Sequence, residues 1–290
     1  MLDKILVPLD GSELAERALD PAYALAQKRG GEVILLRVPV EAAMLGTHLS
    51  GFGFVGSDPT VPMFHHDADE YMSVIRRQRP PTGFTLHTRV IDGDVAGVIV
   101  DTAADERVDL LIMSTHGYSG FTRWMLGSVT ERVLHSASCP VLAVRSSRPI
   151  QNVLVTLDGS ALAEQALAPA LEIAHRLGSQ ATLLTAVPKK ASQDEEAGRH
   201  HAFSSPDEAA AYLQDAVTKH TRPGLSIQTE VRVGPAASTI LSYVERHGTD
   251  LLAMATHGYT GVRRWVYGSV TDRVVRGAHC DLLVVRPPAA

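Results

Sequence analysis

Residues 114–130 read STHGYSGFTRWMLGSVT, and residues 255–271 read ATHGYTGVRRWVYGSVT. Each stretch follows an apolar run and leads through glycines into the start of an expected helix. The N-terminus of a helix presents N–H groups without intrahelical partners and the positive end of the helix dipole, and glycine lets the backbone approach an anion closely. The sequence therefore predicts two equivalent anion sites, and the expected anion is a nucleotide phosphate.

The repeat extends along the whole chain. The stretch KILVPLDGS at 4–12 returns as NVLVTLDGS at 152–160, and after one further residue both copies continue with Leu-Ala-Glu. Copies of roughly 145 residues have the size of ordinary single domains. We therefore predict two homologous domains, 1–147 and 148–290, which meet at the polar stretch 145–149 and pack together as a pseudo-dimer.

Composition narrows the class of protein. Hydrophobic residues make up 45% of the chain and charged residues 20%, and the net charge is −5, as in an ordinary globular protein. The sequence lacks the basic stripe that would indicate a nucleic-acid partner. No apolar run approaches the roughly 20 residues of a membrane span and no leader precedes the first strand, so we expect no membrane partner and a cytoplasmic location. Cys139 and Cys280 occupy equivalent positions, and no disulfide is expected.

Short apolar runs alternate with helical patterns in both halves. This alternation predicts two doubly wound α/β domains, each a five-stranded parallel sheet with helices on both faces. Pro21 and Pro169 lie at equivalent points in the first expected helix of each half, which they should kink. The expected strands are 4–9, 33–38, 84–90, 110–114 and 140–145, then 152–157, 181–187, 227–233, 250–255 and 282–286. The expected helices are 13–29, 67–79, 94–106 and 128–137, then 161–177, 206–220, 236–247 and 269–278.

Such sheets bind ligands outside the carboxyl ends of the strands, where the strand order reverses. Asp10 ends the first expected strand and the 115–127 loop follows the fourth, so a reversal between these strands brings them together. Asp158 and the 256–268 loop make the second crevice. The aspartates could accept hydrogen bonds from a ribose hydroxyl or an exocyclic amine. Alternatively, the Asp-Gly-Ser stretch is only a turn and an N-cap. Its joint appearance with the glycine loop in both copies favours binding.

The end of each glycine loop also resembles a capping box. Ser128 would be the N-cap, with Glu131 three positions later. In the second half Ser269 is followed three positions later by Asp272, whose acidic side chain is shorter. Capping and phosphate binding are compatible, because several N–H groups are free at a helix start. Arg123 and Arg264 lie inside the loops, where they either reach phosphate oxygens or stay solvated.

With these motifs the chain resembles a tandem universal stress protein. Members of that family that bind ATP carry a glycine, two residues, a second glycine, nine residues, and then glycine followed by serine or threonine. Gly117 and Gly258 match the second glycine of this pattern. Ser114 and Ala255 stand in place of the first glycine, and their Cβ atoms could lower nucleotide affinity. The opening strand of the family is matched by 7–12, and by 155–160 without the proline.

The resemblance implies flavodoxin-like (Rossmann-like) domains that bind ATP, or ADP or AMP, with Mg²⁺ on the phosphates. It further implies that the last strands of the halves pair with each other, that two chains could associate, and that the protein acts as a stress-response binding or signalling module. The implied nucleotide-binding residues are Asp10, Ser12, Val38, Ser114, His116, Gly117, Gly127, Ser128, Val129 and Thr130 in the first half, and Asp158, Ser160, Val187, Ala255, His257, Gly258, Gly268, Ser269, Val270 and Thr271 in the second.

The sequence does not predict a catalytic apparatus. It has no Walker lysine motif, no nucleophile paired with a base and no acidic metal cluster. His116 and His257 are better interpreted as loop-positioning residues than as bases. Three functions stay open: a two-site adenine-nucleotide-binding protein, which we favour; a slow Mg-dependent ATPase; and a scaffold that binds no nucleotide, for which Ser114 and Ala255 are the best support.

Overall fold

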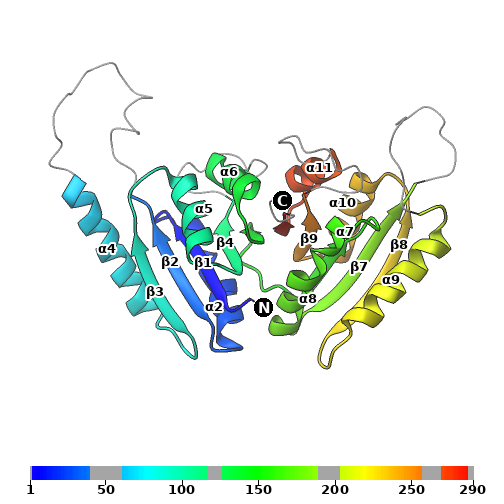
Figure 1. Cartoon of the computed structure of the whole chain (residues 1–290), viewed down its shortest axis with the longest axis horizontal. Helices are drawn as coiled ribbons and strands as arrows, with labels where there is room; N and C mark the ends of the chain where they lie inside the picture. Colours follow the sequence, from blue (N-terminus) through cyan, green and yellow to red (C-terminus); the bar gives the residue numbers. More distant parts are fainter. Residues whose placement is uncertain (1, 40–60, 116–125, 189–202, 257–268, 287–290) are drawn as a thin grey trace, which may run out of the picture.

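The computed structural model describes residues 2–39, 61–115, 126–188, 203–256 and 269–286 (Figure 1). The first half runs through β1 (Lys4–Leu9), α1 (Glu13–Glu16), α2 (Leu19–Gln27), β2 (Glu32–Arg37), α4 (Val61–Gln78), β3 (Thr85–Val90), α5 (Val95–Asp105), β4 (Leu110–Ser114), α6 (Ser128–Ser136) and β5 (Val141–Val144). The second half repeats it as β6 (Asn152–Thr156), α7 (Ala161–Glu164), α8 (Leu167–Leu177), β7 (Gln180–Val187), α9 (Pro206–His220), β8 (Ser226–Val233), α10 (Ala236–His247), β9 (Leu251–Ala255), α11 (Ser269–Gly277) and β10 (Asp281–Val285). The alternation expected from the sequence is thereby confirmed.

The strands form one continuous sheet in the order β3-β2-β1-β4-β5-β10-β9-β6-β7-β8. Neighbouring strands within each half are parallel, and β5 and β10 are antiparallel, with Leu142 opposite Leu283. Both predicted five-stranded sheets and the pairing of their last strands are thus confirmed. Backbone hydrogen bonds between β5 and β10 thus join the two halves at the centre of the sheet.

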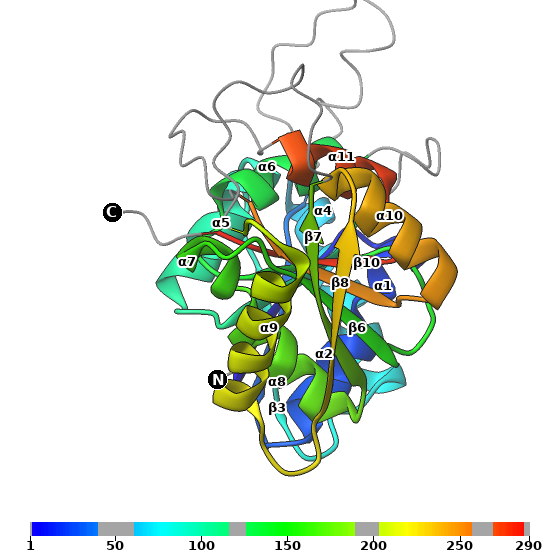
Figure 2. The same ribbon diagram turned by 90° about the vertical axis from the view of Figure 1, so that its right-hand side faces the viewer.

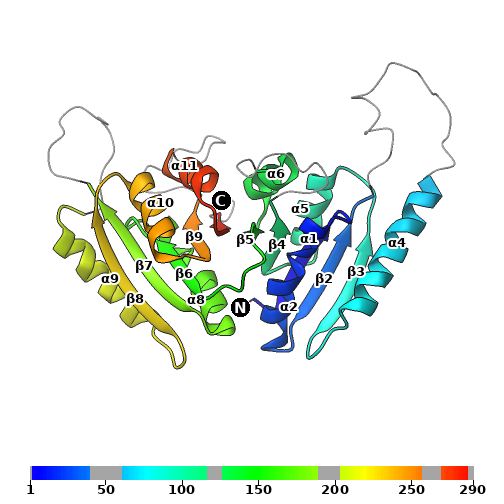
Figure 3. The same cartoon turned by 180° about the vertical axis from the view of Figure 1, so that it is seen from behind.

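Helices cover both faces of this sheet (Figures 1 and 3). Alternate residues of a strand point to opposite faces, so Ile5 and Val7 of β1 join one apolar cluster and Leu6 joins the other. The first cluster is completed by α2, α4, α8 and α9, and the second by α5, α6, α10 and α11. Strands buried on both faces explain the nearly continuous apolar runs of the sequence.

Each proline in the first helix of a half divides that helix in two, as predicted. α1 ends at Glu16 and α2 begins at Leu19, and α7 and α8 are separated in the same way. Proline has no N–H for the carbonyl four residues earlier. At both breaks the chain tightens, because the N–H groups of Ala18 and Ala166 donate to carbonyls three residues back, at 3.1 Å.

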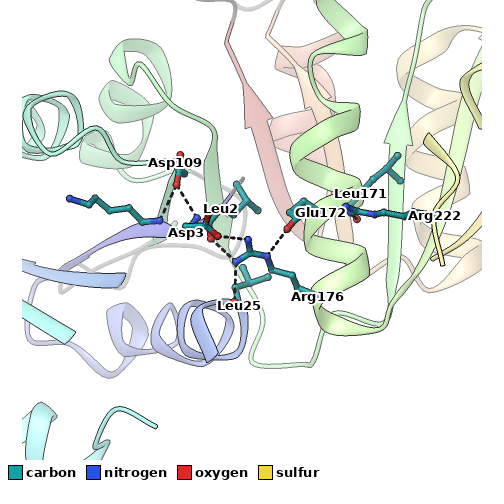
Figure 4. Close-up of polar contacts among 9 residues, drawn as sticks. Leu2, Asp3, Leu25, Asp109, Leu171, Glu172, Arg176 and Arg222 are labelled. Atoms are coloured by element: carbon teal, nitrogen blue, oxygen red, sulfur yellow. Dashed lines mark hydrogen bonds and ion pairs between the residues drawn. The ribbon is translucent and has the colours of Figure 1, made fainter. Parts of the chain in front are cut away.

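Buried polar side chains hold the two halves together. The Asp281 carboxylate, 2% exposed, accepts the backbone N–H groups of Arg145 and Ser146 at 2.8 and 3.0 Å. The Arg176 side chain, also 2% exposed, extends from α8 to the first half, where it donates to Asp3 and to the carbonyl of Leu2, both at 2.7 Å (Figure 4). The segment between β5 and β6 is therefore pinned and the halves form one unit. Among the described residues, no helix is both long and apolar enough to cross a bilayer.

Candidate functional site

The strand order reverses between β1 and β4 in the first half and between β6 and β9 in the second. From β1 the chain moves outward to β2 and β3, then returns past β1 to β4 and β5. At such a reversal the connections leave opposite faces of the sheet, and a crevice opens at the carboxyl ends of the two strands. Asp10, after β1, and Thr115, after β4, thus come to the same edge, as the sequence predicts. Asp158 and Thr256 occupy the equivalent edge.

A tight turn orients the aspartate in each crevice. One oxygen of Asp10, Oδ1, accepts the N–H of Ser12 at 2.9 Å and its hydroxyl at 2.6 Å. Ser12 is in turn the N-cap of α1, with its Oγ accepting the N–H of Ala15 at 3.1 Å. Gly11 between them has φ of +85°, in the left-handed region that glycine adopts without strain. The turn and the N-cap are therefore real, and they fix the direction of the carboxylate.

The second half repeats this turn. Asp158 Oδ1 accepts the N–H and hydroxyl of Ser160 at 3.0 and 2.6 Å, and Ser160 caps α7 through the N–H of Ala163 at 3.1 Å. Ser12 and Ser160 thus contribute to the site through the turn. Contact of either aspartate with a ligand stays a prediction.

The start of α6 is fastened to the end of β4. The Thr130 hydroxyl donates to the carbonyl of Ser114 at 3.1 Å, and the N–H of Gly127 donates to the carbonyl of Thr115 at 2.9 Å. A Cβ at Gly127 would lie 3.1 Å from that carbonyl oxygen, which is closer than side chains tolerate without a shift. This contact is the physical reason for a glycine here. The second half has the equivalent bond from Thr271 to the carbonyl of Ala255, at 3.2 Å.

The prediction that Ser128 caps α6 is wrong. Gly127 is the N-cap, with extended backbone angles of −62° and 147°, and Ser128 is the first helical residue. The tie from Gly127 to Thr115 turns the chain into the helix one residue earlier than the capping-box pattern suggests. Since glycine has no side chain, no cap bond covers the first turn, where Ser128, Val129 and Thr130 lie. The N–H groups of a first turn have no intrahelical acceptors, so this uncapped start is suited to an anion.

In the second half α11 begins at Ser269, followed by Val270 and Thr271 in its first turn. The structure thus brings the predicted first-turn residues of both halves to equivalent places. His116, Gly117, Arg123, His257, Gly258, Arg264 and Gly268 lie outside the described residues, and their roles stay predictions.

Val38 and Val187 lie at the carboxyl ends of the strands next to β1 and β6. Val187 is the last residue of β7, and Val38 is one residue beyond the end of β2. Both are buried, with 5% and 3% exposure. They are thus placed to form an apolar wall beside each crevice, and contact with a base stays a prediction.

The sequence reasoning missed one difference between the crevices. Arg37 Nη1, at the end of β2, donates to the carbonyl of Leu9 at 3.2 Å, directly before Asp10. In the second half the hydroxyl of Thr185 donates to the carbonyl of Leu157 at 3.0 Å. A cation thus holds the strand end in the first half and a neutral group in the second. Alignment of the two repeats places Arg37 opposite Thr185, a signal that could have revealed the difference.

A half-buried tyrosine accompanies each crevice. The ring centre of Tyr71 lies 5.9 Å from the guanidinium carbon of Arg37, and its hydroxyl donates to Glu16 at 3.2 Å. Burial and the Glu16 carboxylate raise the pKa of Tyr71 above its usual range. Burial and Glu164 do the same to Tyr212 in the second half. Both phenols therefore stay neutral at physiological pH, and neither is suited to act as a base.

The described residues are better suited to bind a nucleotide than to hold a metal ion by themselves. They contain no group of three or more histidine, cysteine, aspartate or glutamate side chains that could hold a metal. Each crevice instead combines a helix start, an oriented carboxylate and an apolar wall, and in the first half that helix start has no side-chain cap. These features match the phosphate, the ribose and the base of a nucleotide, respectively.

Comparison with known proteins agrees with this architecture. The model of the universal stress protein family matches residues 1–145 and 149–286. Universal stress protein Slr1230 of Synechocystis sp. is 26% identical over 307 residues, which cover 98% of this chain and 100% of that protein. Universal stress protein MJ0577 of Methanocaldococcus jannaschii is 34% identical over 155 residues, which cover 50% of this chain and 96% of that protein.

A similar fold is found among solved structures. The crystal structure of a universal stress protein from Archaeoglobus fulgidus superposes with a TM-score of 0.74, covering 99% of each chain at 20% identity. The two matches of the family model coincide with the two halves of the sheet described above.

Proposed function

The chain belongs to the universal stress protein family, and from this premise we propose that each half binds one adenine nucleotide, ATP or else ADP or AMP. The observation that carries the proposal is the start of α6. A glycine N-cap, tied to the end of β4, leaves the first turn of the helix uncapped beside a topological switch point. This is the arrangement that places phosphates in doubly wound nucleotide-binding folds.

Each part of the crevice has a proposed role. The first-turn N–H groups of Ser128 to Thr130 receive the phosphates. The carboxylate of Asp10 accepts hydrogen bonds from the ribose or the base, and Val38 packs against the base. The second half assigns the same roles to Ser269 to Thr271, Asp158 and Val187. Mg²⁺ bound with the nucleotide would neutralise phosphate charge, and the hydroxyls of Ser128 and Ser269 are the side chains best placed to reach it.

Binding, rather than turnover, is the proposed activity. The hydroxyls of Ser12 and Ser160, which donate to the two aspartates, also serve as N-caps, and both half-buried tyrosines are held neutral. Nucleotide occupancy would order the glycine loops, and the ordered surface would be recognised by a partner or by a second copy of the chain. The protein would thus act as a stress-response binding module, and association of two chains stays a prediction.

A scaffold without nucleotide is the second candidate, and one observation favours it. Ser114 and Ala255 carry Cβ atoms at the family's first glycine position, and Ala255 is 7% exposed, so it has little room to move. Crowding at this position would weaken phosphate binding. The substitutions Ser114→Gly and Ala255→Gly should then raise affinity for nucleotide.

Direct analysis of the purified protein tests the proposal. The protein is denatured and any released nucleotide is identified by chromatography and mass spectrometry, with its amount scaled to chain concentration. Two equivalents are expected from the intact chain, and one from either Asp10→Ala or Asp158→Ala. If nothing is released, and added ATP does not raise the melting temperature as binding linkage requires, the scaffold function replaces nucleotide binding.

A further inference from the structure

One arginine bridges the two helices that begin at the proposed nucleotide sites. Arg276 of α11 donates from Nε to Asp272, in the first turn of the same helix, at 2.9 Å. It also donates from Nη2 to Glu131, in the first turn of α6, at 3.5 Å. Both helices lie at the same end of the molecule (Figures 1 and 2). A single cation therefore compensates one carboxylate beside each site.

The far ends of the same helices are held crosswise. Arg145, directly after β5 of the first half, donates to the carbonyl of Val275 at 2.7 Å and also to the carbonyl of Ala278, at the end of α11. Arg286, directly after β10 of the second half, donates to the carbonyl of His135 near the end of α6. Cations at these positions complement the negative ends of the helix dipoles. Each helix is thus fastened by the other half.

The last strand residue before each of these arginines also bonds to the residue that follows β4 or β9. The carbonyl of Val144, next to Arg145, accepts the N–H of Thr115 at 3.1 Å, and the carbonyl of Val285, next to Arg286, accepts the N–H of Thr256 at 3.0 Å. The spacing between α6 and α11 is therefore set by both strand ends. The helices cannot separate to relieve a change of charge between them without breaking these bonds.

We propose that the two nucleotide sites are coupled antagonistically through Arg276, so that filling one site weakens the other. This inference rests on the proposed function. Phosphates at the start of α6 add negative charge beside Glu131 and draw the shared guanidinium toward the first site. Asp272 then loses its compensating charge and repels phosphates at the second site. Arg276 acts as a positioning residue, and the crosswise bonds of Arg145 and Arg286 keep the two sites within its reach.

Calorimetric titration of the nucleotide-free full-length protein with ATP and Mg²⁺ tests the coupling. The affinity of the second site is measured in Asp10→Ala, where the first site is empty, and in the intact chain, where it is filled. A weakening of about threefold to fivefold on filling is expected, the upper range that exposed ion pairs support. It should shrink as salt rises, because the affected groups are exposed and added ions screen them.

Two variants of α11 separate the bridge from a general loss of charge. Arg276→Gln should reduce the coupling to less than about twofold. Arg273→Gln removes an exposed arginine from the same helix that does not form the bridge, and should leave the coupling intact. Thermal melting of both variants confirms that they fold.

The outcomes distinguish the two proposals. Two bound equivalents with equal, independent affinities would overturn the coupling and leave the proposed function standing, as would a coupling that persists unchanged in Arg276→Gln. Absence of any binding would overturn the proposed function and the coupling with it.

Discussion

Replacing Arg176 with methionine should destabilise the whole chain, because this side chain supports the junction of the two halves from a buried position. Its Nε donates to Glu172 at 2.7 Å, and its two terminal nitrogens donate to Asp3 and to the carbonyls of Leu2 and Leu25 (Figure 4). Methionine keeps much of the volume and makes none of these bonds. Glu172 would keep only Arg222, at 2.8 Å, as its charged partner.

The expected loss follows from this burial. Removing one partner of a buried ion pair costs about 3 to 5 kcal/mol, because the remaining charge is left without compensation. The Asp3 carboxylate is 45% exposed and water can replace its partner, so most of the cost falls on Glu172 and the two carbonyls. An unfolding entropy of about 2.1 cal/mol/K per residue gives about 0.6 kcal/mol/K for the chain. The melting temperature should therefore fall by about 5 to 8 °C if the chain unfolds as one unit.

Calorimetry and equilibrium unfolding in urea measure this loss. Arg176→Lys keeps a charge but not the planar fork, and should recover part of the stability. Lys219→Met removes an exposed ion pair with Asp215 and should leave the unfolding midpoint unchanged. A loss below about 1 kcal/mol in Arg176→Met would mean that Glu172 and the carbonyls find other partners at little cost, and that Arg176 does not support the junction.

Three more predictions concern other parts of the molecule. Burial raises the pKa of Asp281 from 3.8 to about 6, so the stability that this carboxyl contributes is fully present below about pH 4 and is lost as pH rises through 6. Urea unfolding across this range should show that loss in the intact chain and not in Asp281→Asn. Gly127→Ala brings a Cβ to 3.1 Å from the carbonyl oxygen of Thr115, so the start of α6 must shift slightly and nucleotide affinity in the first half should fall. Calorimetric titration beside the intact chain measures this, and unchanged affinity would mean that the start of α6 accommodates the Cβ. Burial raises the pKa of Cys139 to about 11 and that of Cys280 to about 12, so iodoacetamide should modify both thiols only when the chain unfolds. Mass spectrometry measures the labelling, and fast labelling of the native chain would count against the burial of the thiols.

Much of the fold could be predicted because its signals are local and occur twice. The apolar runs, the helix patterns between them and the prolines that divide the first helices all depend on neighbouring residues, and the structure confirms each. The duplicated Asp-Gly-Ser turn likewise appears as expected. The capping pattern at Ser128 was misleading because Gly127 is held by the carbonyl of Thr115, a residue twelve positions earlier. Local propensity does not include such a contact.

Two α/β halves, the strand ends that carry the candidate residues and the family resemblance can all be read from the chain before it folds. The residues that act across the halves are defined by the folded molecule: Arg176 under the junction, Arg145 against α11, Arg286 against α6, and Arg276 between two carboxylates. The sequence pattern gives no signal for the partners of these arginines. Their partners are up to 174 residues away in the sequence and are met only when β5 pairs with β10 and the two halves dock. Periodicity depends on neighbouring residues and predicts which face of an element is buried. The residues that this face contacts are determined only when distant elements pack together.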